Sequence, residues 1–360
     1  MSKKVTIQAI AEKAGVSRGT VDRAIHQRGR ISPEAALKIR KIADEMGYVP
    51  KGERDTSYGK QEQEENKKQS RRRTVKIGIV TQLAKSSFML EVNRGIRDAA
   101  AELKERGVML LLEERFSVDE EEQLAAIDHL LEQGIDGLAL MPVDSERIRQ
   151  KINVLIEEKQ IPVVTFNSDI VGTGRICYVG MDNRKSGQTA AGLMGLMTRG
   201  IGKILVITGY FSSHVDNMRV DGFVEELKAG FPDLELAGVQ RGSGQAQGVE
   251  RIIVNTMLGM QGIAGIVVVS GGQAGIRAAF ESLQLDRRPY VIIYDLTPRN
   301  EKILQDGIAD FLIDQEGYVQ GYRPPYILAD LLQKGHGPKE EYIYTDIHIK
   351  TKYNLKKTVS

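Results

Sequence analysis

Apolar positions near the N-terminus recur every three or four residues, which is the period of an α-helix. This pattern predicts three short helices. Thr6 is a suitable N-cap for the first helix, and Gly15 ends it. Ser17 caps the second helix, and Ser32 before Pro33 opens the third. A helix, a tight glycine-containing turn and another helix form the arrangement that presents its second helix to the major groove of DNA.

From Thr74 onward, apolar strands alternate with amphipathic helices. The predicted strands include V-K-I-G-I-V, V-M-L-L-L-E, G-L-A-L-M-P and P-V-V-T-F, and the pattern restarts at K-I-L-V-I-T-G, G-I-V-V-V-S and Y-V-I-I-Y-D. Continuous apolar strands that alternate with helices predict parallel sheets covered on both faces. Two such series predict an α/β core of two doubly wound lobes, with a ligand crevice at the carboxyl ends of the strands.

The segment between these two parts is polar. Residues 51–73 contain no Val, Ile, Leu, Met or Phe, which predicts a flexible linker. The predicted organisation is therefore a helical head over residues 1–50, a linker over 51–73 and an α/β core over 74–360, and a chain of 360 residues is long enough for two or three domains.

Composition narrows the class of protein. No run approaches the roughly 18 consecutive apolar residues that a membrane-spanning helix needs. The N-terminus carries charge where a signal peptide places its apolar segment, so we expect a cytoplasmic protein. The single cysteine, Cys177, excludes an internal disulfide framework and a cysteine zinc site.

The net charge of +2 hides an uneven distribution. Residues 1–73 carry 18 basic and 10 acidic side chains, whereas residues 74–360 carry 32 basic and 38 acidic ones. A basic head on an acidic body points to an anionic polymer as a partner of the head alone. A solvated basic tail is the alternative, but such tails do not carry helical apolar periodicity.

The motifs of common enzyme classes are absent from the sequence. G-I-G-K-I lacks the glycine spacing of a phosphate-binding P-loop, there is no G-x-S-x-G or H-E-x-x-H, and the five histidines are scattered. S-G-G-Q-A-G follows a predicted strand and could cradle phosphate, although a tight strand-to-helix turn explains it equally well. We therefore expect a protein that is not an enzyme and that uses no metal and no cofactor.

The second predicted helix carries the residues best suited to read DNA. Arg18, Gly19 and Arg23 face outward, and arginine matches the two acceptors of guanine. Ser17, Thr20 and His26 can donate to phosphates, which fixes register without reading sequence. The alternative is a small helical bundle with a solvated face.

The segment V-T-I-Q-A-I-A-E-K-A-G-V-S-R-G-T-V-D-R-A-I, followed by I-S-P-E and G-Y-V-P, resembles the DNA-binding head of the lactose-repressor (LacI/GalR) family. The resemblance places Arg18, Gly19 and Arg23 at the specificity positions, and Asp22 departs from the usual serine. The DNA-binding residues that it implies are Thr6, Ser17, Arg18, Gly19, Thr20, Arg23, His26, Arg30 and Tyr48. Family members place a hinge helix with a leucine in the linker; this linker has no leucine, and Ser57 falls near its place.

The body resembles the periplasmic sugar-binding fold, especially its ribose-binding branch, in I-P-V-V-T-F-N-S-D, D-N-R-K-S-G, N-M-R-V-D-G-F, I-I-Y-D and L-I-D-Q. The resemblance implies that Phe88 stacks on a sugar ring and that polar groups bind the hydroxyls. The implied effector-binding residues are Phe88, Asp144, Asn167, Asp182, Arg219, Asp295 and Gln315. Ser168 replaces a common arginine and Gly271 a common asparagine, which suggests another monosaccharide, a polyol or an inositol-like ring rather than ribose. Each of these residues could instead have a structural role, such as a helix cap for Asp295.

In this architecture the chain crosses between the lobes three times. We expect the first lobe at residues 74–180 and 316–338, and the second at 181–315 and 339–360. The resulting interpretation is a homodimeric DNA-binding transcriptional regulator that is expected to repress a carbohydrate-utilisation operon. A small sugar or polyol controls its affinity for the operator. The resemblance implies a bacterial protein that is associated with the nucleoid. The alternative is a sugar-sensing or carrier module whose basic head is a non-specific nucleic-acid anchor.

Overall fold

A computed structural model describes residues 6–26, 33–46, 48, 74–210 and 213–355. The chain forms two compact units that divide between Arg73 and Thr74. The predicted linker over 51–73 lies outside the described residues. No helix within the described ranges is both long and apolar enough to span a lipid bilayer.

The first unit contains the three predicted helices, α1 (Ile7–Ala14), α2 (Arg18–His26) and α3 (Pro33–Glu45). The hydroxyl of Thr6 accepts a hydrogen bond from the Ala9 amide at 3.2 Å, and Gly15 ends α1 in the left-handed conformation with φ 67°. Buried apolar side chains from all three helices form one core: Ile10, Ala11, Val21, Ala24, Ile39 and Ala43. The predicted helix–turn–helix is therefore confirmed, whereas the predicted cap Ser32 lies outside the described residues.

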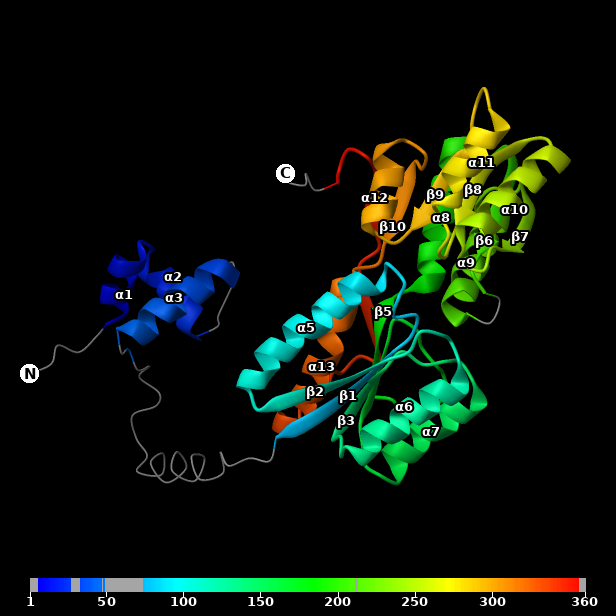
Figure 1. The fold of residues 1–360 in the computed structure, drawn as a ribbon. Coiled ribbons are helices and arrows are strands. Elements are labelled where there is room, and N and C mark those ends of the chain that lie inside the picture. Colours follow the sequence, from blue (N-terminus) through cyan, green and yellow to red (C-terminus); the bar gives the residue numbers. More distant parts are fainter. Residues whose placement is uncertain (1–5, 27–32, 47, 49–73, 211–212, 356–360) are drawn as a thin grey trace, which may run out of the picture. The chain divides into compact units, whose positions relative to one another are not determined.

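The second unit is built from two lobes, each with one largely parallel sheet (Figure 1). In sheet order, the first lobe contains β2 (Val108–Glu114), β1 (Val75–Thr81), β3 (Gly137–Leu140), β4 (Val163–Phe166), β5 (Cys177–Met181) and β11 (Tyr342–Thr345). Its helices are α5 (Met89–Glu105), α6 (Glu120–Glu132), α7 (Glu146–Glu157) and α13 (Gly317–Lys334). Helices α5 and α13 cover one face of the sheet and α6 and α7 the other, each over its own buried apolar cluster.

The second lobe repeats this plan. In sheet order, it contains β7 (Leu234–Arg241), β6 (Gly202–Thr208), β8 (Ile263–Val268), β9 (Tyr290–Tyr294), β10 (Phe311–Asp314) and β12 (His348–Lys350). Its helices are α8 (Asn183–Thr198), α9 (His214–Gly230), α10 (Ala246–Gly259), α11 (Gly275–Leu283) and α12 (Pro298–Gln305). The predicted fold, two doubly wound lobes, is confirmed. In each lobe the second strand of the sequence lies at the sheet edge, outside the first, and the later strands follow on the other side of the first strand. The order of the strands therefore reverses at the first strand, and such a reversal opens a crevice at the carboxyl ends of the strands.

The chain crosses between the lobes after β5, after β10 and between β11 and β12. The prediction that residues 339–360 all belong to the second lobe is wrong. Strand β11 pairs in parallel with β5 of the first lobe, with Tyr342 opposite Tyr178, and only β12 pairs with β10 of the second. Both short strands have the same apolar and polar alternation, so the local pattern does not say which sheet edge each one joins.

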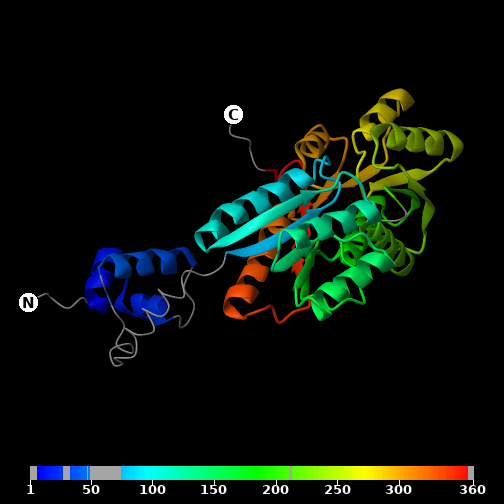
Figure 2. The same ribbon diagram turned by 60° about the horizontal axis from the view of Figure 1, so that its bottom comes forward.

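Glycines allow two helix pairs to approach closely in corresponding places. A Cβ on Gly187 of α8 would lie 2.0 Å from the Arg219 main-chain oxygen on α9, and one on Gly222 would lie 2.0 Å from that of Arg184. In the first lobe Gly321 of α13 meets the backbone of α5 in the same way, and the two helices lie side by side in Figures 1 and 2. The crossing in the second lobe fixes the position of α9, whose N-terminal half reaches the crevice.

Candidate functional site

The outward face of α2 presents most of the residues expected to bind DNA. Arg18, Gly19 and Arg23 are exposed, while Val21 and Ala24 on the opposite side are buried in the core of the first unit. An α-helix with two exposed arginine side chains on its outward side and a packed apolar stripe on the other suits insertion into a major groove.

Two of the expected phosphate-binding residues also stabilise α2. The Ser17 hydroxyl accepts from the Thr20 amide at 3.3 Å, and the two hydroxyls lie 2.9 Å apart. Arg23 donates from Nη2 to the Thr20 hydroxyl at 3.4 Å. Tyr48 packs against the head core, so its ring has a structural role. The His26 side chain and Arg30 lie outside the described residues.

A cleft of about 640 Å³ lies between the two lobes of the second unit. Six of the seven expected effector-binding residues line it: Phe88, Asp144, Asn167, Arg219, Asp295 and Gln315. Ser168 and Gly271, the two positions that depart from the family pattern, also line it. The volume suits a monosaccharide-sized ligand with its hydration, because small-molecule clefts occupy about 300–1,000 Å³.

Asp182 does not line this cleft. Its carboxylate accepts a hydrogen bond from the Lys185 amide at 3.0 Å and so caps the N-terminus of α8. The structure gives Asp182 a capping role at the first crossover, and we leave it out of the proposed ligand site.

Arg219 is the central side chain of the second-lobe wall. It is only 2% exposed. Its Nε donates to Asn183 Oδ1 at 2.9 Å, its Nη1 donates to the Val269 main-chain oxygen at 2.8 Å, and its guanidinium lies 4.5 Å from the centre of the Tyr294 ring. Within the described chain, Nη2 is buried without a hydrogen-bond partner. A buried unpaired donor carries a desolvation penalty of about 1–3 kcal/mol or more. Arg219 is also one of the residues that line the cleft.

Two carboxylates flank this guanidinium. Burial raises the pKa of Asp216 and of Asp295, and the positive charge of Arg219 opposes the rise in both. Asp295 takes a positive φ of 72° at the end of β9, where backbone strain is tolerated only if its surroundings hold it. Acceptors and a strong donor therefore converge on one side of the cleft, as recognition of a ring with several hydroxyls requires.

Asp216 lines the cleft but was not predicted from the sequence. Its Oδ2 accepts from the amides of Gly209 at 3.0 Å and Tyr210 at 3.4 Å, so it holds the loop after β6 against α9. Asp216 precedes Arg219 by three residues, one helical turn, and this spacing is a signal that could have revealed it. Other polar side chains that line the cleft and were not predicted include Gln82, His214, Ser270, Gln273, Thr297 and Asn300.

The first-lobe wall contributes an aromatic ring and fewer charges. Phe88 is partly buried at the start of α5, beside Gly317. Asp144 lies 3.3 Å from Arg149 Nη2 within its own lobe and 3.6 Å from Nδ1 of His214 in the other lobe. The Ser168 hydroxyl donates to the Pro142 main-chain oxygen at 2.8 Å.

A buried chain of hydrogen bonds links the two walls. Asn167 Nδ2 donates to Gln320 Oε1 at 2.9 Å, and Gln320 Nε2 donates to the Gln315 main-chain oxygen at 2.6 Å. Gln315 Nε2 in turn donates to Asp295 Oδ1 at 2.6 Å. Gln320 is fully buried and does not line the cleft, so it connects one cleft-lining residue of the first lobe to two of the second.

Comparisons with known proteins agree with this architecture. Residues 6–51 match the family described as "Bacterial regulatory proteins, lacI family", and residues 77–336 match the "Periplasmic binding protein domain" family. The maltose regulon regulatory protein MalI of Escherichia coli (strain K12) is 28% identical over 234 residues, which cover 64% of this chain and 62% of that protein. The HTH-type transcriptional regulator CelR of Thermobifida fusca is 26% identical over 233 residues, 63% of this chain and 62% of that protein.

Among solved structures, GanP, a glucose-galactose binding protein from Geobacillus stearothermophilus, has a TM-score of 0.72 at 21% identity. The similarity covers 79% of this chain and 99% of GanP, and it shows the fold alone. The matched segments span about 62% of the length of the two curated relatives named above.

The fold and the cleft define a two-lobed binding protein that carries a helix–turn–helix head. The chain belongs to the periplasmic binding protein domain family through residues 77–336, and its N-terminal unit is a lacI-family regulatory domain.

Proposed function

We propose that this protein is a DNA-binding transcriptional regulator, expected to repress a carbohydrate-utilisation operon, and that a small sugar or polyol binds between its lobes. One observation carries the proposal: a lacI-family head and a polar cleft with a buried unpaired arginine donor occur in one chain. A homodimer fits this function because one head makes few base contacts and two half-sites multiply them.

The chemistry of the cleft supports a ring that carries several hydroxyls. Phe88 offers a face for ring C–H groups, Arg219 a free donor, and Asp295 an acceptor that Gln315 orients. The names of MalI and GanP refer to maltose and to glucose and galactose, which agrees with a carbohydrate. The replacements at Ser168 and Gly271 favour another monosaccharide, a polyol or an inositol-like ring over ribose.

The proposed mechanism is ligand-dependent closure of the lobes. A ligand that contacts both walls stabilises one relative position of the lobes, and operator DNA selects among these positions through the heads. Because the coupling is reciprocal, operator and effector must change each other's affinity by the same factor. The protein acts by binding and not by turnover, in keeping with the regulator names of its curated relatives.

A thermal-shift screen tests the ligand site. The full-length protein is screened against monosaccharides, polyols, inositols and their phosphates, together with Asp295→Ala and the surface control Asp286→Ala. A ligand at 100 times its Kd should add about 2.7 kcal/mol of stability. We expect a hit that Asp295→Ala loses and Asp286→Ala keeps; a hit that survives in Asp295→Ala would place the ligand elsewhere.

Selection of DNA from a random pool tests the head. We expect an enriched palindrome whose affinity changes when the screened effector is added, and whose enrichment is lost in Arg18→Ala and in Arg23→Ala but not in the α1 variant Lys13→Ala. Steep salt dependence with no sequence preference would instead support a non-specific anchor on a carrier module.

A further inference from the structure

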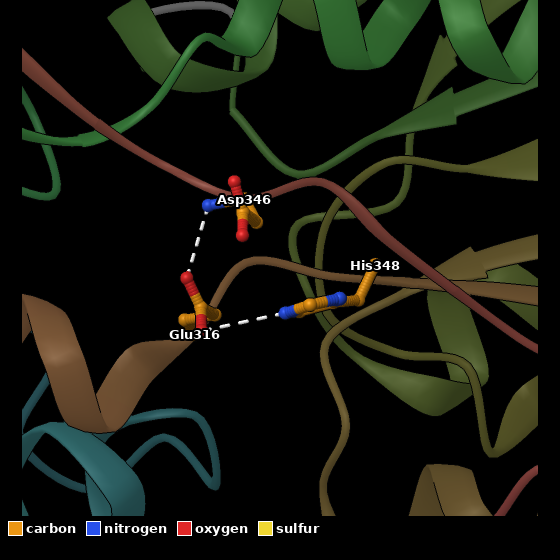
Figure 3. Close-up of side chains that lie close together, drawn as sticks. All are labelled: Glu316, Asp346 and His348. Carbon is orange, nitrogen blue, oxygen red and sulfur yellow. Dashed lines mark hydrogen bonds and ion pairs between the residues drawn. The ribbon is translucent and has the colours of Figure 1, made fainter. Parts of the chain in front are cut away.

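Three side chains of types that can bind a metal ion gather where two of the three lobe crossovers run side by side (Figure 3). Glu316 lies between β10 of the second lobe and α13 of the first. Asp346 lies between β11 of the first lobe and β12 of the second, and His348 begins β12. One ligand atom from each residue lies within 4.8 Å of the others. The cluster therefore joins two chain segments that connect the lobes.

The register of the sheet explains why these residues meet. Strands β10 and β12 are antiparallel, and Asp314 pairs with His348. Extension of this register by two residues places Glu316 opposite Asp346, and Glu316 Oε2 accepts from the Asp346 amide at 3.0 Å. Asp346 and His348 are two residues apart, which in extended chain directs both side chains to one face. The backbone thus brings the ligands together without needing an ion.

The donor set suits a divalent transition metal. His348 Nε2 lies 3.3 Å from Glu316 Oε1, and the two side chains are 41% and 28% exposed, so an ion from solvent can enter and keep water ligands. One imidazole nitrogen with two carboxylates is a ligand combination that zinc accepts, whereas Mg²⁺ prefers oxygen ligands alone. A cation would also relieve the repulsion between the Glu316 and Asp346 carboxylates.

We propose that Glu316, Asp346 and His348 bind a divalent transition-metal ion such as Zn²⁺, and that the ion clamps two of the three crossovers. The bound ion restrains relative movement of the lobes. The binding site stands independently of the proposed function, whereas its effect on the affinity of the cleft for a carbohydrate rests on that function.

Calorimetric titration of ZnCl₂ into tag-free, full-length protein tests the site. We expect a site of one Zn²⁺ per chain whose affinity falls at least tenfold in His348→Ala and in Glu316→Gln. The matched control is His336→Ala, an exposed histidine beyond the end of α13 and outside the cluster. Mg²⁺ at the same concentration should give no such site. Zinc binding that is absent, or that is unchanged in both cluster variants, overturns the proposal.

The clamp is tested with the carbohydrate found in the thermal-shift screen. We expect Zn²⁺ to change its Kd in the wild type and in His336→Ala but not in His348→Ala. An unchanged Kd in zinc-loaded wild type overturns the clamp. Failure of the proposed function is separate, because it leaves zinc binding intact while the screen shows no carbohydrate bound in the cleft.

Discussion

Gln320 of the first lobe donates a hydrogen bond from Nε2 to the main-chain oxygen of Gln315, on the second-lobe side of a crossover, at 2.6 Å. Through this bond the amide of Asn167 and the carboxylate of Asp295, on opposite walls of the cleft, belong to one buried network. A buried network in which every polar group has a hydrogen-bond partner specifies one arrangement of its side chains, whereas a network with unpaired groups destabilises the fold. Gln320 is therefore a positioning residue for the cleft.

Gln320→Leu should lower the stability of the core and weaken ligand binding in the cleft. The apolar side chain fills the space but removes the acceptor of the Asn167 amide and one donor to Gln315, whose main-chain oxygen keeps the Thr345 hydroxyl as a donor. The expected cost is about 1–3 kcal/mol in total. We expect a lower urea midpoint and a weaker affinity for the carbohydrate found by thermal shift. The exposed Gln305→Leu, on α12, is the control and should change neither. A wild-type urea midpoint and a wild-type carbohydrate affinity in Gln320→Leu would show that this network does not position the cleft.

Asp295 should lower the folding stability of the protein at neutral pH, although it contributes to ligand binding. Its pKa is raised from 3.8 by burial, so the folded chain retains a proton that the unfolded chain has released. The stability contribution of Asp295 therefore falls as pH rises from about 4 through the folded-state pKa. We expect Asp295→Asn to lose this dependence in urea unfolding between pH 4 and 7, to be at least as stable as wild type at pH 7, and to bind the carbohydrate less well. A variant less stable at pH 7 would contradict this.

Much of the fold could be predicted from local patterns, because buried parallel strands and amphipathic helices have distinct periods. The helix–turn–helix was predictable from Thr6, Gly15 and Ser17, whose side chains or backbone freedom act within one turn. The edge of each sheet was not predictable in this way. Strand β7, an edge strand, mixes exposed and buried positions, and β11 joins the first lobe through pairing with a strand far away in the sequence.

The cleft was predictable only in part, because strand ends supply both ligand residues and helix caps. Asp295 and Asp182 both follow strands, and the sequence pattern is the same for each, yet only Asp295 lines the cleft. Gln320 could not be predicted, since its partner Asn167 lies 153 residues away and the pair leaves no local signal. The resemblance to sugar-binding proteins, and not the local sequence pattern, indicated which of these residues to expect at the cleft.

Gly187→Ala should displace α9 and with it Asp216 and Arg219, which line the cleft. The added methyl would lie 2.0 Å from the Arg219 main-chain oxygen, and overpacking of this kind costs about 1–3 kcal/mol. Gly192→Ala in the same helix is the matched control: a Cβ there meets nothing within 4 Å, and alanine favours the helix. We expect a lower thermal midpoint and weaker carbohydrate binding for Gly187→Ala alone. Equal behaviour of the two variants would show that the close crossing does not position Arg219.

Asp182→Ala should reduce stability without altering ligand affinity. Loss of the carboxylate removes the N-cap of α8, which costs about 0.5–2 kcal/mol. Asp182→Ser should restore most of this stability, because serine caps as well as aspartate does. Thermal denaturation and carbohydrate titration of the two variants check the assignment. A tenfold loss of affinity in Asp182→Ala at full occupancy of the folded state would return Asp182 to the ligand site.

Gly19→Ala and Gly15→Ala should separate DNA recognition from folding of the head. Gly19 has room for a methyl, since its nearest neighbour is Arg23 Nη1 at 3.6 Å, and alanine favours α2 by about 1 kcal/mol. Gly15 has φ 67°, where alanine costs about 1–2 kcal/mol. In Gly19→Ala we expect unchanged or higher head stability with a shifted base preference, because the methyl would lie beside Arg23, one helical turn away on the same face of α2. In Gly15→Ala we expect lower stability with the same preference among bound sequences. DNA selection measures the base preference of both variants, and thermal denaturation measures their stability. An unshifted preference in Gly19→Ala would exclude position 19 from the face of α2 that reads the bases.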